Sequence, residues 1–205
     1  MFEGCGGCCL ALILIPVLCC VMVACGVIYV YSNAPDAPLS DRFKPSVAEA
    51  QAFDAEISRA TTQARTSGSG WFVLQFTERE LSSWMALEGE QYAEENGHSF
   101  PFEDVQVGLD DGEMTFYGEL EQSHLTLPVK VVIKPGVDGS GHFEFDITSV
   151  DVGGLSAPGF VLNSLSDQFA DVLAKPFEDL PGNYTLYEQT LVIQDGTFAV
   201  QGNRR

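Results

Sequence analysis

The sequence predicts an α+β fold in which an N-terminal transmembrane helix precedes a mostly antiparallel sheet of hairpins packed on helices. The 22 residues from Leu10 to Tyr31 carry no charge, and a helix of that length spans roughly 30 Å of hydrocarbon. From Phe102 onward, apolar and polar residues alternate between turns rich in Asp and Gly. This period of two, interrupted by such turns, is typical of antiparallel hairpins.

The apolar segment divides the N-terminus into a tail, residues 1–9, and a transmembrane helix, residues 10–31. A cleaved signal peptide fits poorly, because no Lys or Arg precedes Leu10 and the run is long for a signal sequence. A lipoprotein signal stays open as an alternative, since Met22-Val23-Ala24-Cys25 loosely resembles the lipobox of bacterial lipoproteins. In that case Cys25 would be acylated and would anchor the chain.

All six cysteines lie in or beside this segment, so the rest of the chain has none for disulfides or nucleophilic chemistry. Cys5, Cys8 and Cys9 include a Cys-x-x-Cys spacing, but no second pair or histidine follows to complete a tetrahedral metal site. We therefore expect these three to be acylated beside the membrane or to serve as small residues at a helix contact. No metal or other cofactor is predicted.

Residues 32–45 have the composition of a linker, with several prolines and mixed charge. Arg42 and Lys44 would favour a cytoplasmic C-terminal side by the positive-inside rule. The stalk-like composition of the linker favours the opposite orientation, with residues 46–205 forming an extracytoplasmic domain. After the apolar segment the chain carries 28 acidic and 10 basic residues, a formal charge of −18. This charge argues against nucleic acid as a partner, and any lipid contact must use apolar surface.

Two helices and a strand are expected at the start of the domain. Ser46 is the predicted N-cap of a helix that ends near Arg65, with apolar residues every three or four positions. A strand over residues 71–76 follows a Ser-Gly break. Thr77 and Glu80 have the spacing of a capping box, which begins a second helix that ends near Glu95.

Three hairpins and one helix make up the remainder. The hairpins are expected over residues 102–117 with a turn at Asp110-Asp111-Gly112, over 124–152 with a turn at 135–141, and over 184–201 with a turn at Gln194-Asp195-Gly196. Between the second and third hairpins, an apolar helix begins after Pro158 and ends before Pro176. It is the most apolar helix of the domain.

No residue pattern indicates catalysis. His98, His124 and His142 form no metal-binding pair on a helix and adjoin no nucleophile. The segment from Gly154 to Gly159 differs from a nucleophile elbow because Pro158 occupies its fifth position. We therefore expect a protein without enzymatic activity.

A family resemblance rests on the order of the hairpins and on several short segments. These are residues 127–135, Asp138-Gly139, 143–147, 149–154, the helix start at 158–163, Leu180-Pro181 and Asp195-Gly196. Together they resemble the membrane-anchored YpmS-type bacterial proteins. Those proteins are in turn similar to LmeA-type phospholipid-binding proteins and to tubular lipid-binding (TULIP-like) domains. The resemblance covers roughly residues 76–202 and involves turns and hairpins, with no catalytic signature.

The resemblance implies a long helix lying in a strongly curved, TULIP-like sheet, with an apolar space for acyl chains between them. It also implies a single-pass protein of the cell membrane whose domain binds or handles lipid at the cell envelope. Periodicity supplies the candidate lining residues: Trp84 and Met85 on the second helix, opposite Leu162, Leu165, Phe169 and Leu173 on the third. Each of these is also suited to an ordinary hydrophobic core. The alternative function is a structural or regulatory module that binds another envelope protein.

Overall fold

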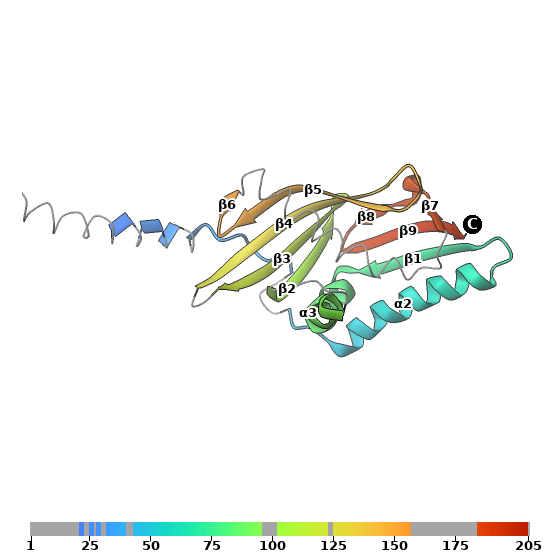
Figure 1. Cartoon of the computed structure of the whole chain (residues 1–205), viewed down its shortest axis with the longest axis horizontal. Coiled ribbons are helices and arrows are strands. Elements are labelled where there is room, and N and C mark those ends of the chain that lie inside the picture. Colours follow the sequence, from blue (N-terminus) through green and yellow to red (C-terminus); the bar gives the residue numbers. More distant parts are fainter. Residues whose placement is uncertain are drawn as a thin grey trace, which may run out of the picture.

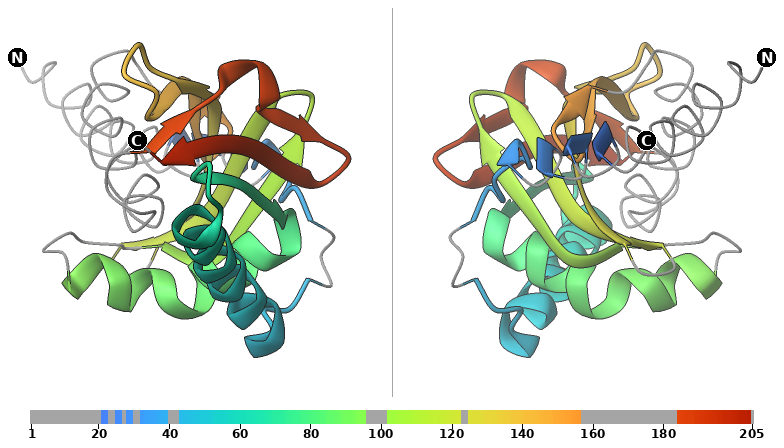
Figure 2. Two further views of the ribbon diagram at one scale, coloured as in Figure 1. Left: turned by 90° about the vertical axis from the view of Figure 1, so that its right-hand side faces the viewer. Right: turned by 90° about the vertical axis from the view of Figure 1, so that its left-hand side faces the viewer.

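The computed structural model describes residues 21, 22, 25, 26, 28, 29, 32–39, 43–95, 102–122, 125–156 and 184–204. Helices α2 and α3 lie on the same side of two antiparallel sheets (Figures 1 and 2). The predicted α+β class with antiparallel hairpins is confirmed. The expectation of one sheet is wrong, because the hairpins are divided between a five-stranded and a four-stranded sheet.

The predicted transmembrane segment, 10–31, lies mostly outside the described residues. In the described part of the chain, no helix combines the length and the apolar character needed to cross a bilayer. Val21, Met22, Ile28 and Tyr29 are helical and exposed, with 52 to 68% of each residue's surface accessible.

Helices α2, Val47–Thr66, and α3, Glu78–Glu95, have the predicted bounds within one or two residues. The predicted capping box at the start of α3 is confirmed, since the Thr77 N–H donates to Glu80 Oε2 at 2.7 Å and the Glu80 N–H donates to Thr77 Oγ1 at 3.3 Å. Ser46 precedes α2 as predicted, but its side chain makes no capping hydrogen bond. Its backbone N–H donates instead to Ser83 Oγ on α3, which joins the two helices.

The four-stranded sheet pairs the first strand of the domain with the last. Strand β1, Trp71–Thr77, runs antiparallel to β9, Thr197–Arg204, and β9 also pairs with β7, Tyr184–Leu186, and β8, Val192–Gln194. A single strand was predicted over 184–193. It is interrupted by a 3-10 turn, Glu188–Thr190, whose Thr190 hydroxyl accepts the Gln201 N–H at 2.9 Å.

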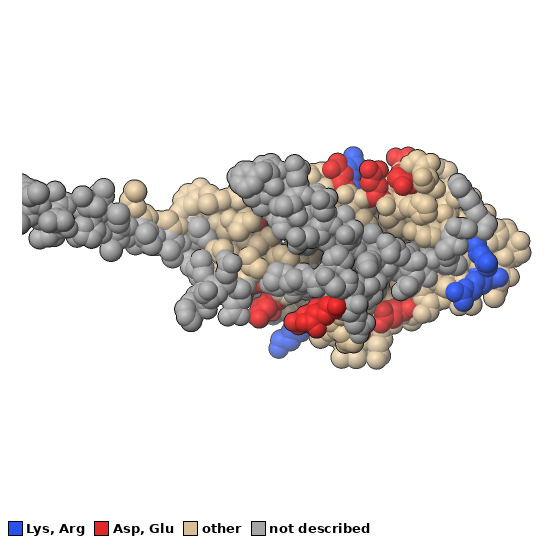
Figure 3. Space-filling model, viewed as in Figure 1, with Lys and Arg blue, Asp and Glu red and all other residues tan. Residues whose placement is uncertain are grey.

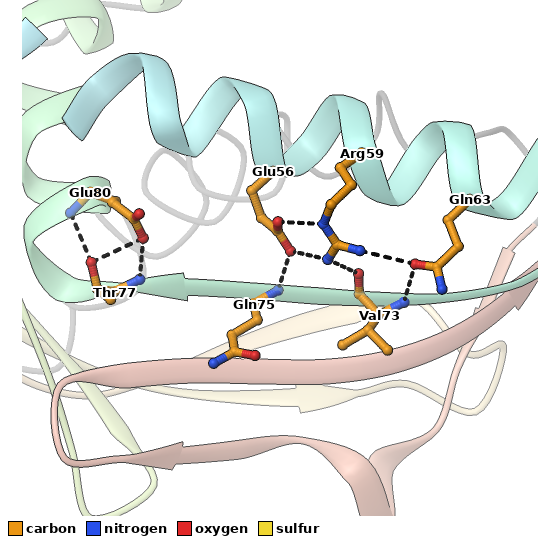
Figure 4. A network of polar contacts seen from close by, with 7 residues as sticks. All are labelled: Glu56, Arg59, Gln63, Val73, Gln75, Thr77 and Glu80. Atoms are coloured by element: carbon orange, nitrogen blue, oxygen red, sulfur yellow. Dashed lines mark hydrogen bonds and ion pairs between the residues drawn. The ribbon is translucent and has the colours of Figure 1, made fainter. Parts of the chain in front are cut away.

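Side chains of α2 cover the outer edge of β1 (Figure 4). The Gln63 Oε1 atom accepts the N–H of Val73 at 3.3 Å, Arg59 donates to the Val73 carbonyl at 2.9 Å, and Glu56 accepts the N–H of Gln75 at 2.8 Å. Glu56 and Arg59 are themselves paired. An unpaired strand edge is a template for adding another strand. These contacts satisfy that edge within the chain.

The five-stranded sheet has the order β2-β3-β4-β5-β6. Its strands are β2, Phe102–Asp110, β3, Glu113–Gln122, β4, Leu125–Val137, β5, Phe143–Val152, and β6, Leu155–Ser156. The β4–β5 turn is shorter than predicted, because Pro135 and Gly136 belong to β4 and pair with Phe145 and Glu144. Asp138 closes the turn by accepting hydrogen bonds from the backbone N–H groups of Ser140 and His142, each at 2.8 Å. These hydrogen bonds lower the pKa of Asp138, and the one from His142 has the largest effect.

The two sheets meet where two predicted Asp-Gly turns lie against each other. The Gly112 N–H donates to the Ile193 carbonyl at 3.0 Å, and the Gly196 N–H donates to the Leu109 carbonyl at 2.9 Å. Both turns have a left-handed backbone, with φ of 48° and 82° at Asp111 and Gly112. This geometry suits a two-residue hairpin turn and favours Asp-Gly. Asp195 and Gly196 have the corresponding values of 51° and 73°.

The segment before the domain, 33–39, forms no strand but contacts the five-stranded sheet. Leu39 is buried, and its N–H donates to Gln106 Oε1 at 3.2 Å. Pro38 lies over Gly108, where a Cβ would approach the Pro38 Cβ to 2.6 Å. Asn33 lies beside Gly154, where a Cβ would come within 2.1 Å of the Asn33 carbonyl oxygen. Residues 33–39 are therefore irregular in structure but pack on the domain.

Candidate functional site

One face of the five-stranded sheet is apolar across four strands. The register places Phe116 opposite Val131 and Val131 opposite Val150, so apolar side chains continue from strand to strand. Because side chains alternate along a strand, the charged residues of the same strands project from the opposite face. We call this surface the apolar face; it consists of Val107, Leu109, Met114, Phe116, Leu120, Leu127, Val129, Val131, Ile133, Phe143, Phe145, Ile147, Val150 and Val152.

The centre of the apolar face is fully buried. Val131 has none of its surface exposed, and Val129, Ile133 and Val150 have 3% or less. Phe145 and Ile147, toward the β4–β5 turn, are half-buried. The central residues of the face belong to the same hydrophobic core cluster as Phe53 and Trp84. Helix α3 packs against β2, at one side of this sheet.

Aromatic rings extend the apolar face toward the four-stranded sheet. Phe143 stacks on Phe145 with ring centroids 5.8 Å apart, and it lies 5.9 Å from the ring of Phe198 on β9. Beside these rings is a groove of about 590 Å³ between the β4–β5 hairpin and the chain at 188–191. Its lining residues are Gly112, Lys134, Pro135, Gly136, Glu144, Phe145, Asp146, Glu188 and Leu191. The apolar face is thus bordered at this end by an open groove.

Trp84 and Met85, two of the predicted lining residues, lie in the protein core. Their exposed fractions are 4% and 2%, and the Trp84 ring lies 5.2 Å from that of Phe53 on α2. Phe53 in turn contacts Phe76 edge to face at 5.2 Å. Trp84 thus contacts an aromatic ring of α2, which in turn contacts a ring of β1. The other four predicted residues, Leu162, Leu165, Phe169 and Leu173, lie outside the described residues.

The predicted acylation sites fall at the N-terminus. Cys25 is a free, exposed thiol on a helical residue, and its acylation stays a prediction. Cys5, Cys8 and Cys9 lie outside the described residues. The exposed apolar side chains of Met22 and Ile28 belong to the same helical stretch.

A second cavity, of about 360 Å³, lies at the junction of the two Asp-Gly turns. Its lining includes Pro38, Glu78, Asp110 and Asp195. Glu78 is already used in the fold, because its Oε2 accepts the Leu109 N–H at 3.3 Å and its own N–H donates to the Gly196 carbonyl at 2.9 Å. Within the described ranges, no group of three or more His, Cys, Asp or Glu is placed to hold a metal ion.

The shifted pKa values point to structural contacts. Burial, followed by the charge of Asp54 and a hydrogen bond to it, raises the pKa of Glu88 on α3. Burial also raises the pKa of Tyr117, and Glu119 adds to this effect through its charge and through a contact of 3.4 Å with the hydroxyl. The carboxylates of Asp54 and Glu119 thus each raise the pKa of a neighbouring side chain in the same domain.

No protein-family model and no curated protein matches this chain.

The lining candidates chosen from the sequence omitted the sheet. Helical periodicity places Trp84 and Met85 on an apolar stripe; both residues are buried, and α3 packs mainly on α2 and β2. The alternation of apolar and polar residues places Val129, Val131 and Ile133 on one side of β4, and Val150 of β5 pairs with Val131. Treating that side as a candidate lining would have found the apolar face.

Proposed function

We propose that this chain is a membrane-anchored lipid-binding or lipid-handling protein without catalytic activity. The observation that carries the proposal is the apolar face, which continues across β2, β3, β4 and β5. Small-molecule sites are mostly apolar with a few polar groups at one end. The apolar face, which the strand register keeps free of charged side chains, has the apolar part of this composition.

The energetics of such a face suit acyl chains. Burial of a methylene group contributes roughly 0.8 kcal/mol, so burial of about ten methylenes contributes roughly 8 kcal/mol before the costs of association. A dissociation constant near 1 μM corresponds to about 8 kcal/mol. Burial of additional methylene groups in longer acyl chains offsets part of the association cost without any directional bond. Apolar contact alone is therefore sufficient for useful affinity.

Anchoring in the cell membrane is part of the proposal. The uncharged run from Leu10 to Tyr31 has the length of a transmembrane helix, and the exposed apolar side chains of Met22 and Ile28 suit a lipid environment. Acylation of Cys25 is the alternative anchor. In either case residues 46–205 would be extracytoplasmic and would meet lipid close to the bilayer.

The test is lipid analysis of a domain released from its anchor. A protease recognition sequence inserted between residues 31 and 32 leaves Asn33, Pro38 and Leu39 in their contacts with the sheet. The full chain is purified from membranes and cleaved, and the released domain, residues 32–205, is separated and extracted for mass spectrometry. We expect one phospholipid or fatty acid per domain.

A matched preparation separates bound lipid from carried-over lipid. The separated anchor fragment is extracted in parallel, and the released domain is also incubated with a fluorescent fatty acid. A domain that contains no lipid and takes up none would contradict the proposal. That result would favour the alternative, a structural or regulatory module of the cell envelope.

A further inference from the structure

The helical stretch at the end of the proposed anchor passes directly into contacts with the domain. Asn33 ends this stretch, because its backbone N–H and its side-chain amide both donate to the Tyr29 carbonyl, at 3.1 and 2.9 Å. The carbonyl group of Asn33 lies against Gly154 and leaves no room there for a Cβ. A single residue therefore belongs both to the last turn of the helical stretch and to the surface of the five-stranded sheet.

The residues after Asn33 cross the five-stranded sheet and contact its opposite side. Pro38 lies over Gly108 of β2, and the Leu39 N–H donates to Gln106 of the same strand at 3.2 Å. The contact of Asn33 lies beside β5, so the strands β3 and β4 separate the two points of attachment. Attachment at two separate points fixes the direction in which the helical stretch leaves the domain.

The turn between β5 and β6 is itself firmly held. Gly153 and Gly154 have φ of 60° and 80°, values in the left-handed region that favours glycine. The Gly153 N–H donates to the Pro128 carbonyl at 2.8 Å, and the Gly154 N–H donates to Asp151 Oδ1 at 2.7 Å. The surface against which Asn33 packs is therefore a rigid part of the sheet.

This end of the domain exposes an apolar side chain and little charge. We call it the β5–β6 corner; it consists of Gly153, Gly154, Leu155 and Ser156. None of the four is charged, and Leu155 has 51% of its surface exposed. The described helical residues leave the domain at the end where β6 lies, and the C-terminus lies at the opposite end (Figure 1). In Figure 3 the described atoms at this junction are mainly tan, and most of the coloured charged atoms lie farther from the helical stretch.

Distances along the chain place the β5–β6 corner at the boundary of the membrane. The uncharged run ends at Tyr31, and Asn33 follows about 3 Å farther along a helix axis, at a rise of about 1.5 Å per residue. The polar layer on each side of the hydrocarbon is roughly 5–8 Å thick. Asn33 falls within that layer, and Gly154 in contact with it and the neighbouring Leu155 fall there too.

We propose that the β5–β6 corner rests on the lipid surface beside the anchor helix, with Leu155 in the head-group layer. The inference rests on the proposed membrane anchoring and names the surface of the domain that meets the bilayer. An uncharged corner suits this position because the acidic surfaces elsewhere on the domain would be repelled by anionic lipids. The contacts of residues 33–39 hold the domain in one orientation, with strand β7 directed away from the bilayer.

Photo-crosslinking in liposomes tests the orientation. The benzophenone amino acid p-benzoyl-phenylalanine replaces Leu155 in the full chain. A second variant carries it in place of Val192 as the matched control, since Val192 has 50% of its surface exposed and lies on β8 of the other sheet. Both chains are reconstituted in phosphatidylcholine liposomes, illuminated, and analysed by mass spectrometry for the covalent addition of phosphatidylcholine. We expect severalfold more adduct at position 155 than at position 192.

A spacer variant tests whether the anchor sets this position. A Gly-Ser segment of about 20 residues, with an end-to-end distance of about 25 Å, is inserted between residues 32 and 33 of the chain that carries the probe at position 155. The spacer keeps the contact of Asn33 with Gly154 and separates both from the bilayer, so the adduct should fall to the level at position 192. The same segment added after Arg205 is the control and should leave the adduct unchanged.

Flotation of the liposomes separates this inference from the function on which it rests. A chain that does not float with the liposomes would refute the proposed anchoring. A chain that floats but gives no more adduct at position 155 than at position 192 would overturn the orientation while the anchoring stands. An adduct at position 155 that survives the spacer would overturn it as well. If the variant at position 155 fails to fold, the exposed neighbour Ser156 carries the probe and the same outcomes apply.

Discussion

The buried hydroxyl of Ser82 on α3 bonds both backbone polar groups of Val107 on β2. It accepts the Val107 N–H at 2.7 Å and donates to the Val107 carbonyl at 3.1 Å. Ser82 has no exposed surface, and a β-bulge between Glu103 and Gln106 precedes this contact. A side chain thus replaces a neighbouring strand at the edge of β2. It holds the five-stranded sheet on the helices.

Replacing Ser82 with alanine should destabilise the domain by about 1–3 kcal/mol, because two buried backbone groups lose their partner. Urea unfolding of the released domain measures this change. Thr66→Ala is the control, since the exposed Thr66 hydroxyl donates to the Thr62 carbonyl within α2 at 2.9 Å. A loss at Ser82 no larger than the loss at Thr66 would show that water satisfies Val107 in the variant.

Adding volume at Val131 distinguishes a lipid-lined face from a filled core. If acyl chains lie against the apolar face, Val131→Phe should lower the lipid content of the released domain and change the stability of the lipid-free form little. Val132→Phe, the adjacent residue on the opposite face, should leave lipid content unchanged. Unchanged lipid content with a loss of about 1–3 kcal/mol in Val131→Phe, the usual effect of overpacking, would identify the face as solid core.

Alanine at Gly154 should loosen the segment before the domain from the sheet. Gly154 has φ of 80°, and its added Cβ would lie 2.1 Å from the Asn33 carbonyl oxygen. Gly112→Ala is a matched control, because φ is 82° there and no atom lies within 4 Å. We expect roughly 1–2 kcal/mol of backbone strain in both variants and faster proteolysis of residues 33–39 in Gly154→Ala alone. Equal proteolysis in the two variants would contradict a role for the Asn33 contact.

The pH dependence of stability should include a contribution from Glu88. Its pKa is raised in the folded domain, first by burial and then by Asp54. The folded state therefore binds the proton more tightly than the unfolded state. Between the ordinary pKa of glutamate, about 4.3, and the raised value, the stability from this group falls as pH rises.

The variant Glu88→Gln checks this sign. The amide keeps a hydrogen-bond donor toward Asp54 and carries no charge at any pH. We expect the variant to be more stable than the wild type at pH 7. Its stability should also lack the decrease that the wild type shows as pH rises above the ordinary pKa of glutamate. Urea unfolding from pH 4 to 8 measures both, with Glu90→Gln on the exposed side of α3 as the control. If the stability of the wild type and the stability of Glu88→Gln instead rose with pH by the same amount, the assignment would be refuted.

The local parts of this fold were predictable because their signals lie within a few residues of one another. Thr77 and Glu80 cap α3 as their spacing predicts, and Asp111-Gly112 and Asp195-Gly196 have the left-handed backbone that their turn type requires. The alternation in β4 also placed Val131 and Ile133 on one face. In each case the contact depends on a short stretch of chain.

Contacts between distant residues were not predictable from these patterns. Nothing in the residues around Trp71 indicates that it pairs with Asn203, and the 3-10 turn at 188–190 depends on Thr190 meeting Gln201 on another strand. The role of Ser82 likewise requires β2 as its partner. Periodicity makes Trp84 and Met85 candidates for lining an apolar space or for filling an ordinary core, but it does not reveal that α2 supplies Phe53 as the neighbour of Trp84.

The pairing of β1 with β9 imposes an order on biosynthesis. A ribosome makes β1 early and β9 last among the described strands. The strand Trp71–Thr77 therefore has no β9 to pair with while the rest of the domain is made. Side chains of α2 shield one edge of β1 during this interval, and the edge that later receives β9 stays open. A chain stalled before residue 197 would present an unpaired apolar strand, which is a substrate for chaperones and proteases. Quality control of this protein is thus tied to completion of its last strand.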